Sequence, residues 1–322
     1  MNSYLPFIKK RPLITHNSIL KERIFIPGSE WVYFKLYTGT KTADGILKNE
    51  LYRYVQYLQK SNILYKWFFI RYSDPDFHIR LRLHLKEPND FNTVYIRFYE
   101  TFYPNIKAGI IWNIQCDTYK REIERYGVNT IDIIEDIFYI DSEFVIKLLR
   151  QIDEGNSEHQ RWKVAIMMID SFLCAIAFSI NQRKDLLNMI ADNYRKDFGF
   201  INHPQKKQLD GKFRTFRKEI EEVMLWDKTL NVTNKTIEIV KSRQEAMIPI
   251  IKRLTKMDES GGLEVSMESL LTSIIHMNMN RWFRAKNRLH ELVIYDFMAR
   301  HYTNSVAKQR YNVKSTDSME PE

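Results

Sequence analysis

The distribution of apolar and polar residues divides the chain into two regions with different periodicity. From about residue 29 to residue 120, segments that alternate with a period of two, typical of strands, exchange with segments that repeat every three to four residues, typical of helices. The expected order is strand, helix, strand, strand, helix, strand, over 31–37, 42–60, 67–72, 77–85, 89–103 and 109–119. This order is that of a split βαβ unit or a ferredoxin-like half.

The region after about residue 130 is expected to be helical. Apolar residues recur there at helical spacing over 133–152, 160–180, 185–198, 213–226, 236–255 and 265–302. Glycine and proline are concentrated at 155–156, 199–204 and 260–262, which predicts breaks. The predicted fold class is therefore α+β, with an N-terminal antiparallel sheet of split βαβ type followed by a largely α-helical C-terminal half.

The domain boundaries follow from the same pattern. We expect one domain over residues 1–310, made of a sheet half (28–130) and a helical half (131–303). Residues 311–322 lack apolar periodicity and are expected to be a frayed tail.

The predicted strand 77–85 has two unlike faces. One face is apolar, and the other carries His78, Arg80, Arg82 and His84 at two-residue spacing. Each arginine offers a planar fork that suits a carboxylate or an oxyanion. A solvated sheet face is the structural alternative, since arginines are mostly exposed. The strand is thus a candidate surface for binding an anion.

Two further clusters contain groups that could act in catalysis. Glu122 and Arg125 follow the last predicted strand, at a position where loops often hold functional side chains. Ser273, His276 and Asn280 are three and four residues apart, so they share one face of a predicted helix. His276 is a candidate proton carrier, because histidine titrates near neutral pH. Read alone, either cluster is also compatible with an ordinary surface.

Composition and missing motifs narrow the alternatives. The net charge of +9 arises from 49 basic and 40 acidic residues spread along the chain, so it does not choose between an acidic peptide, a nucleic acid and an acidic protein partner. Two distant cysteines exclude a disulfide framework and a CxxC site. Signatures of metal, nucleotide and serine-hydrolase sites are absent, so no cofactor and no metal are expected.

The location of the protein is expected to be cytoplasmic. The N-terminus has its basic residues after a short apolar stretch, which is the reverse of a secretory signal. No apolar run of 18 residues follows, so no membrane span is expected.

Together the three clusters resemble the C-terminal glutamate-elimination domain of lantibiotic dehydratases, which also occurs as a stand-alone protein in lanthipeptide and thiopeptide gene clusters. The matching segments are 31–37, 68–72, HIRLR at 78–82, EIERYG at 122–127, Asp141-Ser142 and the helix 273–281 with its HMxxNR string. The resemblance covers about residues 28–303, and it depends on the order of these strings more than on any one of them.

The resemblance implies a function in bacteriocin biosynthesis. In that family a partner domain loads glutamate from glutamyl-tRNA onto Ser or Thr side chains of a ribosomal precursor peptide, and the elimination domain removes it to give dehydroalanine or dehydrobutyrine. The implied partners are the glutamylated precursor peptide and a separate glutamylation protein. Direct tRNA binding is not expected, because the larger glutamylation part is missing from this chain. A homodimer is compatible with the sequence.

The resemblance also implies which residues act. The expected catalytic residues are Arg80, Arg82, Arg125 and His276. The expected substrate-binding residues are Arg71, His78, Glu122, Asn280 and Arg281. We hypothesise that His276 moves the proton, that Arg80 and Arg82 bind the glutamyl group and the oxyanion, and that Arg125 anchors the substrate.

Two alternatives remain at this level. Stand-alone relatives include pyridine-forming [4+2] cyclases of thiopeptide pathways, which tend to depart from the arginine set that this chain retains. A non-catalytic basic module could instead bind peptide or RNA on the sheet through Trp67, Phe69 and Tyr72. The elimination hypothesis requires the helix with His276 to lie on the same side of the sheet as Arg80 and Arg82.

Overall fold

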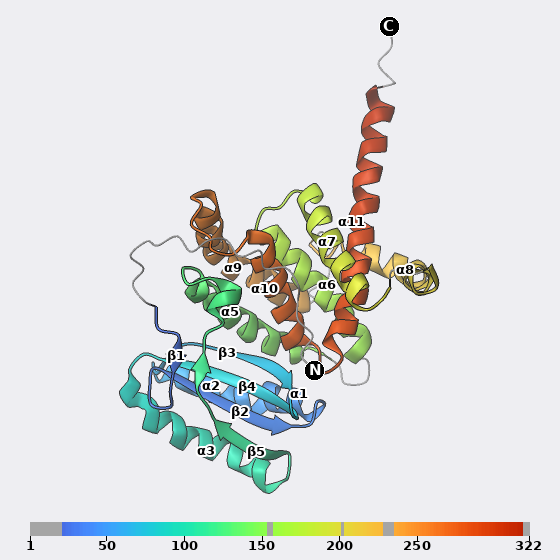
Figure 1. Cartoon of the computed structure of the whole chain (residues 1–322). Coiled ribbons are helices and arrows are strands. Elements are labelled where there is room, and N and C mark those ends of the chain that lie inside the picture. The colour runs from blue at the N-terminus through green and yellow to red at the C-terminus, as the bar shows by residue number, and fades with distance from the viewer. Residues whose placement is uncertain (1–20, 153–156, 201–202, 228–234, 318–322) are drawn as a thin grey trace.

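The computed structural model describes residues 21–152, 157–200, 203–227 and 235–317. It confirms the α+β class, with antiparallel sheets in the N-terminal part and helices in the C-terminal half (Figure 1). The strands are β1 (Ile24–Phe25), β2 (Trp31–Thr38), β3 (Leu64–Ser73), β4 (Phe77–Leu85), β5 (Ile111–Cys116) and β6 (Tyr119–Lys120). The helices of the sheet half are α1 (Thr42–Ile46), η1 (Leu47–Leu51), α2 (Tyr52–Lys60), η2 (Pro88–Asp90), α3 (Phe91–Lys107) and α4 (Ile123–Tyr126).

The helical half contains longer elements. They are α5 (Ile131–Leu149), α6 (Ser157–Ala175), α7 (Ile180–Asp197), α8 (His203–Val223), α9 (Lys235–Glu259), α10 (Met267–Trp282) and α11 (Asn287–Asp317). Among the described residues, none of these helices combines the length and apolar character that a membrane-spanning segment needs. The same residues contain no group of three or more histidine, cysteine or carboxylate side chains placed to hold a metal ion.

The main sheet has the strand order β3-β4-β2-β5, and all neighbouring strands are antiparallel. This is the order expected of a split βαβ arrangement, because β4 is inserted between β2 and β3, which α1 to α2 connect. The strand expected over 109–119 is two strands instead. Its second part, β6, leaves the main sheet and pairs with β1.

The first helical segment contains a π-helical turn that the sequence explains. Its apolar residues Ile46 and Leu51 are five positions apart, and a regular α-helix would place them on different faces. The wider π-turn at Leu47–Leu51 brings the two apolar residues onto the same face of the segment. Ile46, Leu51 and Val55 are all buried.

The helix α3 packs on one face of the main sheet, and α5 and α10 of the helical half lie along its β3 edge (Figure 1). On one face, Phe34 of β2 stacks on Phe98 of α3 with ring centroids 3.9 Å apart. On the other face, Phe68 of β3 contacts Phe138 of α5 at 5.5 Å. The helix α5 therefore packs on the edge strand β3, and its Phe138 reaches the face that carries the polar side chains of β4, since Arg82 pairs with Phe68 in the register.

The C-terminal half differs from the prediction in one consequential place. The segment 265–302 was expected to be one helix, but the chain turns at 283–286, where Lys286 adopts a positive φ of 52°. The apolar spacing runs through this turn without interruption because Trp282 and Phe283 are both buried. α11 therefore folds back against α7 and α10 instead of continuing α10.

The other expected breaks and the tail can also be compared. The breaks at 199–204 and 260–262 fall between α7 and α8 and between α9 and α10. The break at 155–156 lies outside the described residues. The tail expected to fray from Tyr311 is helical up to Asp317, and residues 318–322 are outside the described part of the chain.

Candidate functional site

Aromatic rings pack around the polar side chains of β4. Arg82 lies opposite Tyr33 of β2 and Phe68 of β3 in the sheet. Its guanidinium carbon is 4.7 Å from the centroid of Tyr33, 5.3 Å from that of Phe68 and 4.8 Å from that of Tyr119. Only 7% of Arg82 is exposed. The solvated-face alternative is therefore wrong for this residue.

Arg82 has no anionic partner in the described part of the chain. Its Nε–H is buried and donates to no acceptor among the described residues. The two terminal nitrogens are not among the buried unpartnered atoms, so they keep contact with the surface. A cation held by aromatic rings without a carboxylate is unusual in a folded protein, because buried charges are normally paired. Arg82 is thus placed to receive an anion from outside.

Arg80 and His78 form a second pair on the same face. Arg80 donates from Nε to His78 Nε2 at 3.0 Å, and its guanidinium lies 3.4 Å from the centroid of the Tyr72 ring. His78 is fully buried, and its Nδ1 lies 2.8 Å from the carbonyl oxygen of Asp76. Burial, and secondarily the Arg80 charge, lower the pKa of His78. His78 is therefore a neutral imidazole that orients Arg80, and it is too enclosed to contact substrate directly.

The short helix α4 presents Arg125 toward α10. Arg125 donates from Nε to Ser273 Oγ at 3.3 Å, and its Nη1 lies 3.6 Å from the exposed carboxylate of Glu122. Gly127 ends α4 with a φ of 79°, and a β-carbon there would lie 2.9 Å from Thr130 Oγ1. The glycine of the EIERYG string therefore lets the chain turn from α4 into α5, which fixes the position of Arg125.

His276 is held by a buried carboxylate. Its Nδ1 lies 2.8 Å from Glu291 Oε1 and 3.4 Å from the Tyr194 hydroxyl. Glu291 is fully buried and also accepts a hydrogen bond from Tyr295 at 2.9 Å. A carboxylate on Nδ1 keeps the hydrogen on that nitrogen, so Nε2 of the neutral ring is left with a lone pair. The His276 side chain is 27% exposed, and Nε2 has no partner among the described residues.

Two buried tyrosines, Tyr126 and Tyr194, are affected by the charge of Arg125. Burial raises the pKa of Tyr126 to about 12, while Arg125 and Arg82 act on it in the opposite direction. Burial also raises the pKa of Tyr194, followed by the negative charge of Glu291, whereas Arg125 lowers it. The Arg125 charge therefore acts on a tyrosine near Arg82 and on the tyrosine that contacts His276.

The helix that carries His276 lies along the β3 edge of the sheet. Arg281, five residues after His276 on α10, lies over the Phe138 ring at 4.4 Å, and Phe138 contacts Phe68 beside Arg82. Arg80 and Arg82 thus share one face of β4, and Arg125 contacts Ser273 on the helix that also carries His276. Their action as one site is a proposal developed below.

Arg71 does not join this group. On β3 it points to the opposite face, where its Nη2 lies 2.6 Å from Asp44. Asp44 also binds Arg161 and Arg284, and Arg71 donates from Nε to the carbonyl oxygen of Arg281 at 2.9 Å. The expected substrate-binding role of Arg71 is therefore not supported, because the residue is 2% exposed within a buried ion cluster.

Asn280 and Arg281 have structural contacts as well. Asn280 accepts from the backbone N–H of Arg71 at 3.0 Å and donates to its carbonyl at 2.9 Å, so it closes the free edge of β3. Arg281 is fully buried near Asp141, at 3.7 Å, and burial lowers its pKa to about 10. A direct contact with substrate is excluded for Arg281 as it lies here, whereas Glu122 is exposed beside Arg125.

Sequence reasoning did not identify Glu291 and Tyr194. In a continuous helix over 265–302, His276 and Glu291 would be about 22 Å apart at 1.5 Å per residue. The turn at 283–286 brings them into contact, and no sequence signal marks that turn apart from the polar pair Lys286-Asn287. The aromatic rings around Arg82 were also missed, since Tyr119 comes from β6, outside the main sheet.

The alternative RNA-binding face lacks two of its three expected rings, since only Tyr72 is partly exposed. Trp67 and Phe69 are buried, and the indole of Trp67 donates to Glu143 of α5 at 2.7 Å. An RNA-binding sheet needs exposed rings on which bases can stack.

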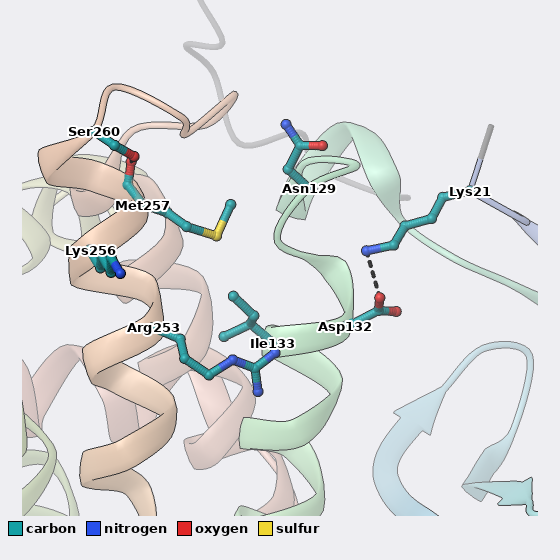
Figure 2. A pocket seen from close by; sticks show the side chains of 8 residues that line it. All are labelled: Lys21, Asn129, Asp132, Ile133, Arg253, Lys256, Met257 and Ser260. Atoms are coloured by element: carbon teal, nitrogen blue, oxygen red, sulfur yellow. Dashed lines mark hydrogen bonds and ion pairs between the residues drawn. The ribbon is translucent and has the colours of Figure 1, made fainter. Parts of the chain in front are cut away.

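A hollow of about 420 Å³ lies elsewhere, between the start of α5 and the end of α9 (Figure 2). Its charges are largely paired, since Lys21 lies 2.5 Å from Asp132, and Arg253 lies 3.1 Å from Asp136. None of the residues predicted to act in catalysis or binding lines this hollow.

Comparison with known proteins identifies a family whose model matches most of this chain. Residues 31–302 match the family model described as the C-terminal region of lantibiotic biosynthesis dehydratase. Nisin biosynthesis protein NisB of Lactococcus lactis subsp. lactis is 28% identical over 305 residues, which cover 90% of this chain and 28% of NisB. Subtilin biosynthesis protein SpaB of Bacillus subtilis is 23% identical over 320 residues, or 95% of this chain and 29% of SpaB. The chain spans less than a third of the length of these curated relatives.

Two solved structures share the fold. The tRNA-dependent lantibiotic dehydratase MibB from Microbispora sp. 107891 superposes with a TM-score of 0.67 at 16% identity, over 92% of this chain and 29% of that one. The pyridine synthase TbtD from thiomuracin biosynthesis superposes with a TM-score of 0.64 at 13% identity, over 86% of this chain and 99% of that one. At these identities the likeness concerns the fold alone.

Proposed function

The chain belongs to the family formed by the C-terminal region of lantibiotic biosynthesis dehydratases, and from this premise we propose that it is a lyase that eliminates glutamate. Its substrate is a precursor peptide with glutamyl esters on Ser or Thr side chains. The products are free glutamate and a peptide with dehydroalanine or dehydrobutyrine. We assign the preceding glutamyl-tRNA-dependent glutamylation to a separate protein.

One observation carries this proposal. Arg82 is a nearly buried cation without a carboxylate partner among the described residues, on the face of β4 that also carries Arg80. The reaction releases a carboxylate and develops negative charge on a peptide carbonyl. A preorganised cation in a poorly hydrated position stabilises such charge far better than a solvated one.

The proposed proton carrier is His276. Its free Nε2 removes the α-hydrogen of the modified residue, and the electron pair of that C–H bond forms the double bond between Cα and Cβ. The bond from Cβ to the ester oxygen breaks, and glutamate leaves as a carboxylate. Glu291 stabilises the imidazolium that forms, because its carboxylate lies 2.8 Å from Nδ1.

The arginines bind negative charge along this path. We assign the enolate-like oxygen and the departing carboxylate to Arg82 and Arg80, neither of which has an ion pair to a carboxylate among the described residues. Arg125 anchors the substrate from α4, with Glu122 beside it as a partner for the amino group of the glutamyl moiety. His78 contributes by orienting Arg80.

The proposal is tested by incubating the protein with glutamylated precursor peptide and following the peptide by mass spectrometry. Each converted site loses one glutamic acid in mass and gains a thiol-reactive double bond. Unchanged mass with the ester intact contradicts the proposal.

One observation favours a second function, which the same assay can test. The superposition with the pyridine synthase TbtD extends over 99% of that chain, so the two proteins share an entire scaffold. If the chain is a pyridine-forming cyclase, it leaves a glutamylated peptide unchanged but converts an already dehydrated one, with loss of the two alkene signals.

A further inference from the structure

Exposed apolar side chains gather beside one edge of the main sheet. On α3, the residues Ile96, Tyr99, Tyr103 and Ile106 are spaced by three, four and three positions, so they form one stripe. Ile110 and Trp112 continue this stripe onto β5. Together these six residues define the edge surface. The inward face of α3 has its own set, including Phe98 and Phe102, so the stripe is not needed for the core.

The strand beside this stripe has an open hydrogen-bonding edge. Asp117 donates its N–H to the carbonyl of Tyr33, and the alternation of an antiparallel ladder then points the backbone groups of Ile114 and Cys116 away from the sheet. No hydrogen bond to these outward groups is found in the described part of the chain.

At the opposite edge of the same sheet, side chains of the helical half bind the backbone groups of β3. On β3, the N–H of Phe69 donates to Ser142 of α5, and Asn280 of α10 binds both backbone groups of Arg71. Proteins commonly protect free edges with charged residues or proline, but β5 reads Ile-Trp-Asn-Ile-Gln-Cys and has neither. The exposed edge of β5 therefore has the properties of a binding site.

We propose that an extended segment of the precursor peptide binds as an additional strand along β5, with every second side chain on the edge surface. This inference rests on the proposed function, since it concerns the substrate of that reaction. Main-chain hydrogen bonds to β5 supply affinity that depends little on sequence, while Trp112 and Tyr99 select apolar side chains. The α3 helix and the strand are joined at this point by the Tyr95 hydroxyl, 2.5 Å from Cys116 Sγ.

The position of this strand suits the proposed catalytic site. Strands in a sheet are about 4.8 Å apart, so a strand added to β5 lies three spacings, roughly 14 Å, from β4. About five residues of extended chain cover that distance. A modified Ser or Thr that follows the bound segment can therefore reach Arg82 across the face that carries Gln115, Lys35 and Arg80.

The width of the edge surface favours a single extended chain. It consists of one strand edge and one stripe of a helix, which is the arrangement that peptide-binding domains use for strand addition. A second copy of the protein could also pair along β5, and the experiment distinguishes that outcome.

The test uses Tyr99→Lys, with Tyr65→Lys as the matched control. Both tyrosines are similarly exposed, at 60% and 62%, but Tyr65 lies on β3, at the other edge of the sheet. The first readout is KM and kcat for the glutamylated precursor. We expect Tyr99→Lys to raise KM about tenfold or more, as for loss of an aromatic hot spot, without changing kcat. Tyr65→Lys should match the wild type.

The second readout is alkylation of Cys116 by iodoacetamide, which does not require catalysis. The probe is the unmodified precursor peptide with its cysteines changed to serine. At about ten times Kd, the peptide should slow the modification of Cys116 roughly tenfold in the wild type and leave it unchanged in Tyr99→Lys. Cys174, whose pKa burial raises to about 11, is the slow internal reference.

The outcomes separate the two proposals. Protection of Cys116 without elimination supports the peptide site and contradicts the proposed function. Elimination without protection, or an unchanged KM in Tyr99→Lys, overturns the peptide site alone. A halved molecular mass of Tyr99→Lys in light scattering, with KM unchanged, also overturns it and assigns the surface to a second copy.

Discussion

At the scale of single residues, Arg82 is distinguished by its missing partner. The buried Arg71, Arg161 and Arg281 all have a carboxylate within 4 Å, whereas Arg82 has only aromatic rings around it. Rings stabilise a guanidinium by roughly 1–2 kcal/mol, which partly offsets the cost of its burial. A residue of this kind contributes little to stability, so its charge is available for function.

This leads to a prediction for Arg82→Met, which keeps an unbranched side chain and removes the charge. We expect the free energy of unfolding to change by no more than about 1 kcal/mol, because the lost cation–π contacts and the relieved desolvation nearly cancel. Elimination should slow by about 100-fold or more. Urea denaturation measures the free energy of unfolding, and the elimination assay measures the rate. The exposed Arg53→Met is the control in each. A loss of several kcal/mol would show that Arg82 is structural.

Glu291 provides a second prediction at this scale. Glu291→Gln keeps the size of the side chain but removes the negative charge from His276 Nδ1. We expect kcat to fall by about 100-fold with little change in KM, since the charge matters only when the imidazolium forms. Tyr295→Phe removes another hydrogen bond to Glu291 without touching His276, and it should reduce kcat much less. Equal effects of the two variants would argue against this assignment.

At the scale of elements, the sequence predicts regular segments well where one pattern decides them. The alternation of β4 gives its bounds as observed, 77–85, and the helical repeat identifies the C-terminal half. It does not show the turn between α10 and α11, because buried Trp282 and Phe283 continue the apolar pattern across it. That turn creates the contact between His276 and Glu291.

The candidate site was predictable to the extent that side-chain chemistry alone suggests it. Arg82 and His276 have the positions expected of them. Arg71 and Arg281 have the same chemistry but are buried among structural partners, and a single strand or helix cannot show what covers its face. The alternation on β3 places Arg71 on the opposite face from Phe68, and this is the sequence signal that separates Arg71 from Arg82.

Asn280 provides a prediction for how the two halves are joined. The Asn280 amide binds the backbone N–H and the carbonyl of Arg71, as a neighbouring strand would. The helix α10 therefore completes the β3 edge. Asn280→Ala should lower the free energy of unfolding by about 2 kcal/mol, since two backbone groups lose their partners. Denaturation of this variant can be compared with Asn188→Ala, which removes only one long side-chain hydrogen bond, of 3.4 Å. Similar stability of the two variants would contradict a joining role.

At the scale of the whole molecule, buried histidines make stability depend on pH. His84 stacks on Trp31 with centroids 4.6 Å apart, and burial, followed by the Lys66 charge, lowers its pKa to about 4. Between about pH 6.5 and pH 4, the unfolded chain binds the proton and the folded protein does not. Stability contributed by the neutral ring is therefore complete above pH 6.5 and decreases as the pH falls toward 4.

The corresponding variant is His84→Phe, which can keep a stacked ring but cannot titrate. We expect its Tm to fall less than that of the wild type between pH 7 and pH 4.5, measured by calorimetry. Some loss should remain, because burial also lowers the pKa of His78. An identical decrease in both proteins would exclude His84 as a source of the acid sensitivity.

The central claim is that Arg82 and His276, almost two hundred residues apart in the sequence, act on one substrate in one step. Single-turnover elimination rates of Arg82→Met, His276→Ala and the double variant test it most directly. If both groups serve the same transition state, the double variant should be about as slow as the slower single variant. Losses that multiply, or single variants that eliminate glutamate as fast as the wild type, would contradict a shared site.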